Sequence, residues 1–143
     1  MQPSDELKSL ILLLYKKEND EGLFRFAQEL YSKEDGVLVI GSEPGEGYAG
    51  YEGVLEFYRR EGETHPEVEV KDIQAFTKNG FGWVVDRVSA RLPGGMKVPV
   101  RHTYLFHQEG NTWKVIHAHI SVGIPDKDLG TIFQKTTREP AEE

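Results

Sequence analysis

Two side chains in a predicted strand have the types and spacing for acid–base chemistry. His102 and Tyr104 stand two residues apart, and on a regular strand such residues point to the same face. A histidine can titrate near neutral pH, so His102 can accept or donate a proton. Tyr104 can donate a hydrogen bond and polarise a carbonyl group. A hydrogen-bonded core histidine fits the same residues, and both interpretations stay open.

A second pair of histidines, His117 and His119, shares one face of the next predicted strand. Two imidazoles on one strand face can hold a metal ion, but a protein metal site takes at least a third ligand. The chain has no cysteine, and no third ligand is obvious near the pair. We therefore expect hydrogen-bonded histidines at an interface here, and we expect neither a metal site nor a cofactor.

Strand and turn signals in residues 101–121 predict that these histidines lie on a β-hairpin. Residues typical of strands fill both arms, and the reversal falls at Glu109-Gly110-Asn111. Further turns are predicted at Asn79-Gly80 and at Pro93-Gly94-Gly95, with a bulge near Lys71-Asp72. The second half of the chain is therefore expected to form an antiparallel meander.

The first half of the chain has helical periodicity. Ser4 is a suitable N-cap for an amphipathic helix, and Asp20 begins a second one. A short buried strand at 37–40 and a glycine-rich loop at 41–50 lead to a third helix at about 51–60. Helices followed by strands predict an α+β fold, a cone of N-terminal helices packed on a strongly bent antiparallel sheet.

Length and composition limit the class of protein. A chain of 143 residues predicts one domain, 1–143, with a fold core at about 5–125 and a polar C-terminal extension at 126–143. The net charge of −7, without a basic cluster, argues against a nucleic-acid partner. The longest apolar run, Leu10 to Leu14, is too short to cross a bilayer, and no secretory signal is recognisable. We expect no membrane partner and a cytoplasmic location.

Several local motifs stand in a characteristic order. They are the strand and loop at 37–50, Arg101-x-Thr103, Gly110…Trp113-Lys-Val, and His117-x-His119-x-Ser121. Together they resemble the SnoaL-like branch of the nuclear-transport-factor-two-like (cystatin-like) superfamily, over roughly residues 5–125. The last motif is similar to the association domain of calcium/calmodulin-dependent protein kinase. The resemblance implies the cone fold and leaves the chemistry open, because this fold carries isomerases, dehydratases, hydrolases and binding modules.

The similarity to the kinase domain implies which residues point into the cone. It places Arg87 on a pocket arginine, with Tyr104 and Ile120 at the two other pocket positions. Alternation along the strand then turns Asp86 outward and leaves no clear carboxylate inside. The expected catalytic residues are His102, Tyr104 and Arg87. The expected ligand-binding residues are Tyr48, Trp83, Arg87, Tyr104, Phe106, Ala118 and Ile120.

These residues define two functional hypotheses. The first is a small-molecule-binding pocket protein that could act as a cofactor-free enzyme of isomerase, dehydratase or hydrolase type. The alternative is a non-catalytic binding or oligomerisation module. The ligand is expected to combine apolar and polar character. The outward sheet face, with Trp113, Val115 and Leu105, predicts a homodimer.

Overall fold

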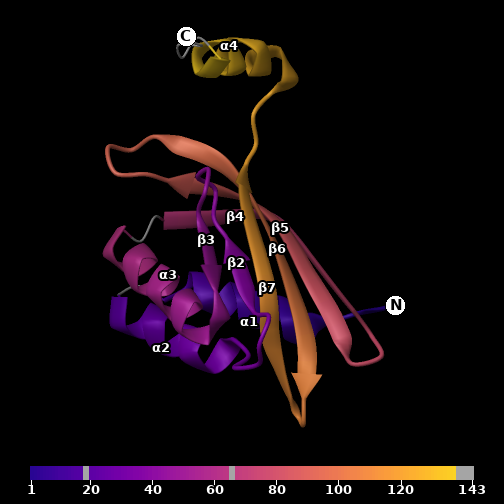
Figure 1. Ribbon diagram of the computed structural model, residues 1–143. Coiled ribbons are helices and arrows are strands. Elements are labelled where there is room, and N and C mark those ends of the chain that lie inside the picture. The colour runs from indigo at the N-terminus through magenta and orange to yellow at the C-terminus, as the bar shows by residue number, and fades with distance from the viewer. Residues whose placement is uncertain (18–19, 65–66, 138–143) are drawn as a thin grey trace.

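Helices cover one side of a curved sheet in the computed structural model (Figure 1), which describes residues 1–17, 20–64 and 67–137. The helices are α1 (Asp5–Tyr15), α2 (Asp20–Leu30), α3 (Gly50–Thr64) and α4 (Asp126–Thr137). The strands are β1 (Gln2–Pro3), β2 (Leu38–Ile40), β3 (Gly47–Ala49), β4 (Glu67–Lys78), β5 (Phe81–Arg91), β6 (Lys97–Glu109) and β7 (Thr112–Val122). The predicted α+β class is confirmed.

The seven-stranded sheet has the order β1-β4-β5-β6-β7-β2-β3. Neighbouring strands are antiparallel except β2 and β7, which run parallel. The meander from β4 to β7 matches the prediction, whereas the parallel pairing was not foreseen. A register shift between Val70 and Asp72 confirms the predicted bulge of β4. Helices α1, α2 and α3 lie together on one side of the sheet (Figure 1).

Helix α1 lies against the sheet because its apolar residues recur at helical spacing. Ser4 caps the helix, since its side-chain oxygen accepts a hydrogen bond from the Leu7 backbone N–H at 3.2 Å. Leu7 and Ile11 are fully buried on the face that meets the sheet. Gly82 of β5 permits this close approach, because a Cβ there would lie 2.5 Å from Cδ1 of Leu7. The packing brings the last residue of the helix, Tyr15, to the inner face of the sheet.

A β-bulge between β6 and β7, not predicted from the sequence, changes which side chains face inward. Leu105 pairs with His117, whereas Phe106 pairs with Val115, so β7 has one extra residue here. Val115 is therefore fully buried, although regular alternation would turn it outward. For the same reason Trp113 packs against the core. The positions expected for Trp113 and Val115 on an outer dimer face are wrong.

The inner face of β5 is the opposite of the predicted one. Val84 pairs with Tyr104 and Asp86 pairs with His102, and directly paired residues share one face of a sheet. Tyr104 is buried among the core residues, so Val84 and Asp86 are buried with it. The predicted orientation is wrong because the pairing of β5 with β6 sets which residues face inward, and a one-residue difference in register turns a side chain to the opposite face.

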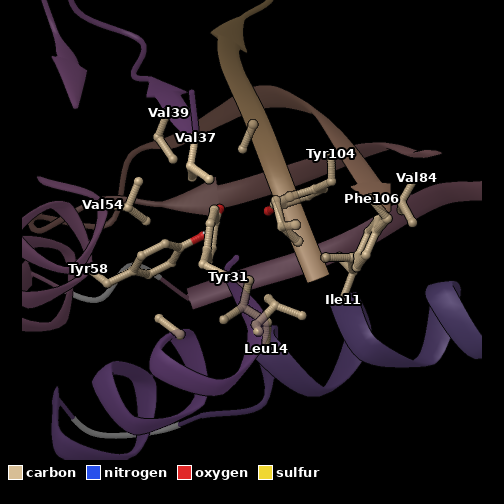
Figure 2. Close-up of a cluster of buried hydrophobic side chains, with 14 of the residues drawn as sticks. Ile11, Leu14, Tyr31, Val37, Val39, Val54, Tyr58, Val84, Tyr104 and Phe106 are labelled. Carbon is tan, nitrogen blue, oxygen red and sulfur yellow. The ribbon is translucent and has the colours of Figure 1, made fainter. Parts of the chain in front are cut away.

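The hydrophobic core fills the space between the helices and the sheet (Figure 2). Val84 of β5 and Phe106 of β6 are fully buried there with Ile11 of α1. Burial of each such side chain contributes roughly 1.5–3 kcal/mol relative to exposure. Tyr31 and Tyr58 satisfy each other's polar groups through a hydrogen bond of 2.7 Å between their hydroxyl oxygens.

The C-terminal extension forms helix α4, which stands apart from the other helices beyond the end of β7 (Figure 1). Its residues Ile132 and Phe133 are largely exposed. The rest of the predicted extension, 138–143, lies outside the described residues. Neither α4 nor any other helix of the described part is long and apolar enough to cross a membrane.

Candidate functional site

Four polar side chains meet on the inner face of the sheet, beside the end of α1. Asp86 lies on β5, His102 and Tyr104 lie on β6, and Tyr15 is the last residue of α1. Oδ1 of Asp86 lies 2.8 Å from Nδ1 of His102, and Oδ2 contacts the hydroxyl of Tyr15. The Tyr15 hydroxyl also lies 3.0 Å from Nδ1 of His102 and 2.9 Å from the hydroxyl of Tyr104. We call these four residues the Asp86–His102 cluster.

Asp86 is a buried carboxyl group, with 1% of its surface exposed. An ionised carboxylate is costly to bury unless hydrogen-bond donors surround it. Tyr15 and His102 each contact a different oxygen of Asp86, which compensates the charge. The side chain of His102 keeps 11% of its surface exposed. The cluster therefore joins a fully buried carboxylate to an imidazole that remains partly accessible.

The positions of the protons follow from counting donors and acceptors. An ionised Asp86 can only accept, so Nδ1–H of His102 and the hydroxyl of Tyr15 both donate to it. Tyr104 then donates to the oxygen of Tyr15. With its proton on Nδ1, neutral His102 has a lone pair on Nε2. Within residues 1–17, 20–64 and 67–137 no hydrogen-bond partner reaches Nε2, so this atom can take a proton from a ligand.

The two tyrosines of the cluster stay protonated. Burial, followed by the negative charge of Asp86, raises the pKa of Tyr15 well above its ordinary value. Burial likewise raises the pKa of Tyr104, and its neighbour Tyr15 adds to the effect. Both phenols are therefore hydrogen-bond donors at neutral pH. Proton acceptance from a ligand falls to His102.

A pocket of about 410 Å³ opens beside the cluster. Tyr15, His102 and Tyr104 line its buried end with Tyr58. The walls are apolar and consist of Leu14, Leu23, Phe57, Val68, Val88, Ala90, Val98, Val100 and Ile120. Exposed residues complete the lining, namely Ser42, Glu43, Leu92, Pro93 and Val122, together with the half-buried Glu61. This arrangement suits a small, mainly apolar molecule whose inner end meets His102.

Some of the expected site residues lie at this pocket or next to it. His102, Tyr104 and Ile120 line the pocket. Phe106 and Ala118 face inward as expected, but both are buried in the core outside the pocket lining. The structure thus brings His102 and Tyr104 together and adds an unforeseen carboxylate.

The other expected site residues lie away from the pocket. Tyr48 is in β3, and its hydroxyl accepts a hydrogen bond from Arg60 at 2.7 Å. Trp83 and Arg87 lie on the outer face of β5. The side chain of Arg87 is 67% exposed, and its guanidinium donates to Asp72 at 2.9 Å. The inward positions expected for Trp83 and Arg87 are wrong, because the pairing of β5 with β6 turns Asp86 inward instead.

Two members of the cluster, Tyr15 and Asp86, were not predicted as site residues. In the sequence, Tyr15 belongs to the apolar face of a predicted helix, and this pattern does not indicate a polar role. Asp86 had a detectable signal. The predicted turn at Pro93-Gly94-Gly95 is centred on residue 94. In a hairpin that is symmetric about this residue, positions equally far from it pair with each other, so Asp86 lies opposite His102.

A second polar group lies near the turn between β6 and β7. Ser32 donates to Glu109 at 2.5 Å, His107 contacts the same carboxylate, and Nε2 of His107 lies 3.4 Å from Glu34. The hydrogen bonds from Ser32 and His107 lower the pKa of Glu109. Glu34, His107 and Glu109 offer ligand atoms within 4.8 Å of one another and could hold a metal ion. The absence of a metal site remains a prediction.

The histidine pair on β7 has a contact with the neighbouring strand. Nδ1 of His117 lies 2.9 Å from the backbone oxygen of Leu38 on β2. The ring centroids of His117 and His119 are 6.4 Å apart. The hydrogen bond helps to attach β2 to β7, and the interface role expected of the two histidines stays a prediction.

Residues 18–125 match the family model of the SnoaL-like domain. Because this match covers most of the chain, the protein belongs to the SnoaL-like family, and the predicted resemblance is confirmed. Among curated proteins, none matches the chain.

Solved structures share the fold. An uncharacterised Caulobacter vibrioides protein with a cystatin-like fold has 18% identity and a TM-score of 0.70, covering 92% of this chain and 96% of its own. A proposed calcium/calmodulin-dependent protein kinase II association domain from Xanthomonas campestris has 14% identity and a TM-score of 0.64, covering 88% and 96%. A proposed ketosteroid isomerase from Parabacteroides distasonis has 15% identity and a TM-score of 0.67, covering 83% and 86%. At these identities the likeness establishes the nuclear-transport-factor-two-like fold alone.

Proposed function

We propose that this protein is a cofactor-free acid–base enzyme acting on a small molecule bound in the pocket, with His102 as the general base. The observation that supports this function best is the environment of His102. Nδ1 is bound to Asp86, and the ring lines the pocket. A carboxylate on Nδ1 favours the tautomer in which Nε2 accepts a proton, and it stabilises the imidazolium that forms.

In the proposed reaction, Nε2 of His102 removes a proton from a carbon next to a carbonyl group of the ligand. The C–H electrons form a carbon–carbon double bond, and the carbonyl π electrons move to its oxygen. The imidazolium then returns the proton while the carbonyl forms again. Return to a different carbon gives isomerisation. Return to a neighbouring hydroxyl group, which leaves as water with its bonding electrons, gives dehydration.

Tyr15 and Tyr104 are positioning residues in this mechanism. Tyr15 holds Oδ2 of Asp86, so that Oδ1 stays directed at Nδ1 of His102. Tyr104 contacts the Tyr15 hydroxyl and fixes its direction. The apolar walls of the pocket limit water near the base, which strengthens the interaction between Asp86 and the imidazolium.

The alternative is a non-catalytic binding module, in which the pocket only holds a ligand. A pocket filled by core side chains would favour this alternative. A pocket of about 410 Å³ with an oriented imidazole at its buried end favours an enzyme. One of the structural relatives is described as a proposed ketosteroid isomerase, and isomerisation is one of the two reactions proposed here.

The compound 5-nitrobenzisoxazole tests for a general base without knowledge of the natural substrate. A base removes its ring C–H proton, the ring N–O bond breaks, and a coloured cyanonitrophenolate forms. We expect the wild-type protein to accelerate this elimination, and His102→Gln to lose about 10²–10⁴-fold of the rate. His119→Gln is the matched control, because His119 is an exposed histidine outside the pocket.

Equal rates for the wild type and a folded His102→Gln variant would contradict the proposed base. Circular dichroism and a thermal melt establish that the variant is folded. Saturable ligand binding without any His102-dependent elimination would favour the binding module instead.

We also propose that two copies associate through the outer face of the sheet. Phe81 and Leu105 are exposed on this part of the molecule, and Trp83 and Val85 are half-buried beside them. Phe81 and Trp83 are of the aromatic type enriched in protein interfaces. The set differs from the predicted one, because Trp113 and Val115 belong to the core.

A further inference from the structure

We propose that Tyr58 is a further catalytic residue, whose hydroxyl donates a hydrogen bond to the carbonyl oxygen of the ligand while His102 removes the neighbouring proton. This inference rests on the proposed function, because it adds a second contact with the same ligand. Tyr58 belongs to the apolar pattern of a predicted helix and was not predicted as a site residue. Two observations carry the inference, namely the place of Tyr58 in the pocket lining and its hydrogen bond with Tyr31.

Tyr58 reaches the buried end of the pocket from the helical side of the molecule. It projects from α3 toward Tyr31 (Figure 2), and 6% of its surface is exposed. Neighbouring rings hold it in place, with the centroid of Phe57 at 5.1 Å and that of Tyr31 at 5.3 Å. His102 lines the same pocket from β6. A ligand in the pocket therefore meets an acceptor from the sheet and a hydroxyl group from a helix.

The hydrogen bond between the hydroxyl groups of Tyr31 and Tyr58 is 2.7 Å long and uses one of their two protons. Tyr31 is fully buried and does not line the pocket, and within the described part of the chain its hydroxyl contacts Tyr58 alone. If Tyr58 donated, the proton of Tyr31 would be buried without an acceptor, which is costly. Tyr31 is therefore the donor, and the proton of Tyr58 is left for a group in the pocket.

The other donors at the buried end of the pocket are already used. Nδ1–H of His102 and the hydroxyl of Tyr15 donate to Asp86. Tyr104 donates to Tyr15. Among the described residues of the lining, none is Lys or Arg. Tyr58 is thus the buried side chain of this described lining that still has a proton to donate, and a carbonyl oxygen is an acceptor that can take it.

Tyr58 keeps its proton at neutral pH, so it acts as a hydrogen-bond donor. Burial raises the pKa of Tyr58 well above its ordinary value. The hydrogen bond from Tyr31 lowers this pKa in part, and the negative charge of Glu61 raises it again. Negative charge develops on the carbonyl oxygen when His102 takes the proton. A donor that is already fixed in place stabilises this charge without rearrangement.

The compound 2-tetralone, an apolar bicyclic ketone, tests the inference through its carbonyl group. The carbonyl stretching frequency of the bound ketone, measured by isotope-edited infrared spectroscopy, reports the hydrogen bond. Exchange of the protons next to the carbonyl in heavy water, followed by NMR, reports proton removal. We expect the wild-type protein to lower the carbonyl frequency below its value in cyclohexane. Tyr58→Phe should restore most of the difference and slow the protein-catalysed exchange about 10²–10³-fold.

Variants of other tyrosines serve as controls. Tyr31→Phe breaks the same bond between hydroxyl groups but keeps the hydroxyl of Tyr58, so the carbonyl frequency should stay low and the exchange should slow by less than about tenfold. Tyr51→Phe removes a hydroxyl that donates to the backbone oxygen of Gln28 outside the pocket lining, and both measurements should match the wild type. The double variant Tyr31→Phe/Tyr58→Phe leaves no unpaired hydroxyl, and it replaces Tyr58→Phe if the single variant does not fold.

Several results would overturn the inference. They are an unchanged carbonyl frequency in folded Tyr58→Phe, equal losses in Tyr58→Phe and Tyr31→Phe, and a wild-type protein that does not bind 2-tetralone saturably or leaves its carbonyl frequency unshifted. The proposed base is judged separately, because 5-nitrobenzisoxazole has no carbonyl group and its elimination tests His102. His102→Gln should lose the proton exchange and keep the low carbonyl frequency, so either proposal can fail without the other.

Discussion

Asp86 and His102 stand directly opposite each other on β5 and β6, with Oδ1 of the carboxylate 2.8 Å from Nδ1 of the imidazole. Both residues belong to long, paired strands, so the pair is held by the sheet and not by a loop. Tyr15, from the end of α1, secures the second carboxylate oxygen. The orientation of the imidazole is therefore a direct result of strand register and helix packing.

Removal of the charge on Asp86 should weaken the base. Asp86→Asn keeps the size of the side chain, but its amide cannot compensate the imidazolium of His102, and its NH₂ group favours the wrong imidazole tautomer. We expect the rate of 5-nitrobenzisoxazole elimination to fall by about 10²–10⁴-fold. Asp72→Asn is the control, because this aspartate is paired with Arg87 on the outer face. An unchanged rate in folded Asp86→Asn would remove the carboxylate from the mechanism.

Tyr15→Phe should slow the catalysis that we propose for His102. The substitution removes only the hydroxyl that donates to Asp86. With one donor fewer, Asp86 is held less firmly against Nδ1 of His102, so the elimination of 5-nitrobenzisoxazole should slow down. The unfolding free energy should fall by about 1–3 kcal/mol, since buried polar groups lose a partner.

Tyr31→Phe separates a positioning role from a structural one. Tyr31 makes a comparable buried hydroxyl contact with Tyr58, outside the Asp86–His102 cluster. Its loss should also destabilise the protein, but the rate of 5-nitrobenzisoxazole elimination should stay at the wild-type value. A slower elimination in both folded variants, or in neither, would count against a specific role for Tyr15.

The fold was largely predictable because local patterns determine it. Ser4 and the apolar spacing after it indicate α1, and the turn at Asn79-Gly80 closes the hairpin of β4 and β5, with Asn79 at a φ of 52° and Gly80 at 79°. The parallel pairing of β2 with β7 joins segments far apart in the chain. No local pattern specifies such a long-range contact, so it was missed.

The site was predictable only in part, because it depends on strand register. The spacing of His102 and Tyr104 sufficed to place both inside. Arg87 was placed by similarity to another domain, and a one-residue difference on a strand moves a side chain to the opposite face. The bulge opposite Leu105 had the same effect on Trp113, and the sequence shows no glycine or other marker for it.

Arg87→Met should have little effect on either stability or binding. The ion pair with Asp72 is exposed, with side-chain exposures of 67% and 44%, and such pairs contribute about 0–1 kcal/mol. Urea denaturation should give a midpoint close to that of the wild type, and the kcat and KM for 5-nitrobenzisoxazole elimination should be unchanged. A specific rise in KM would show that Arg87 reaches a ligand despite its outer position.

Glu109 should make the stability depend on pH under acidic conditions. Its pKa in the folded protein is lowered, first by the hydrogen bond from Ser32 and then by His107. The stabilisation is therefore complete above the unfolded pKa of about 4.3, and it is lost as the pH falls through the folded pKa. Urea midpoints between about pH 6 and pH 3 should decline less steeply in Glu109→Gln than in the wild type. Glu29→Gln should keep the wild-type slope.

Leu105→Glu should separate the proposed dimer into monomers. Leu105 is 39% exposed on the outer face of β6, and a buried carboxylate from each copy would be uncompensated in a twofold interface. Sedimentation at micromolar concentration should give a dimer for the wild type and a monomer for the variant. Leu13→Glu is the control, because Leu13 is exposed to a similar degree on α1, away from the outer sheet face. A wild-type monomer at this concentration, or a dimer that survives Leu105→Glu and dissociates in Leu13→Glu, would rule out the outer sheet face as the interface.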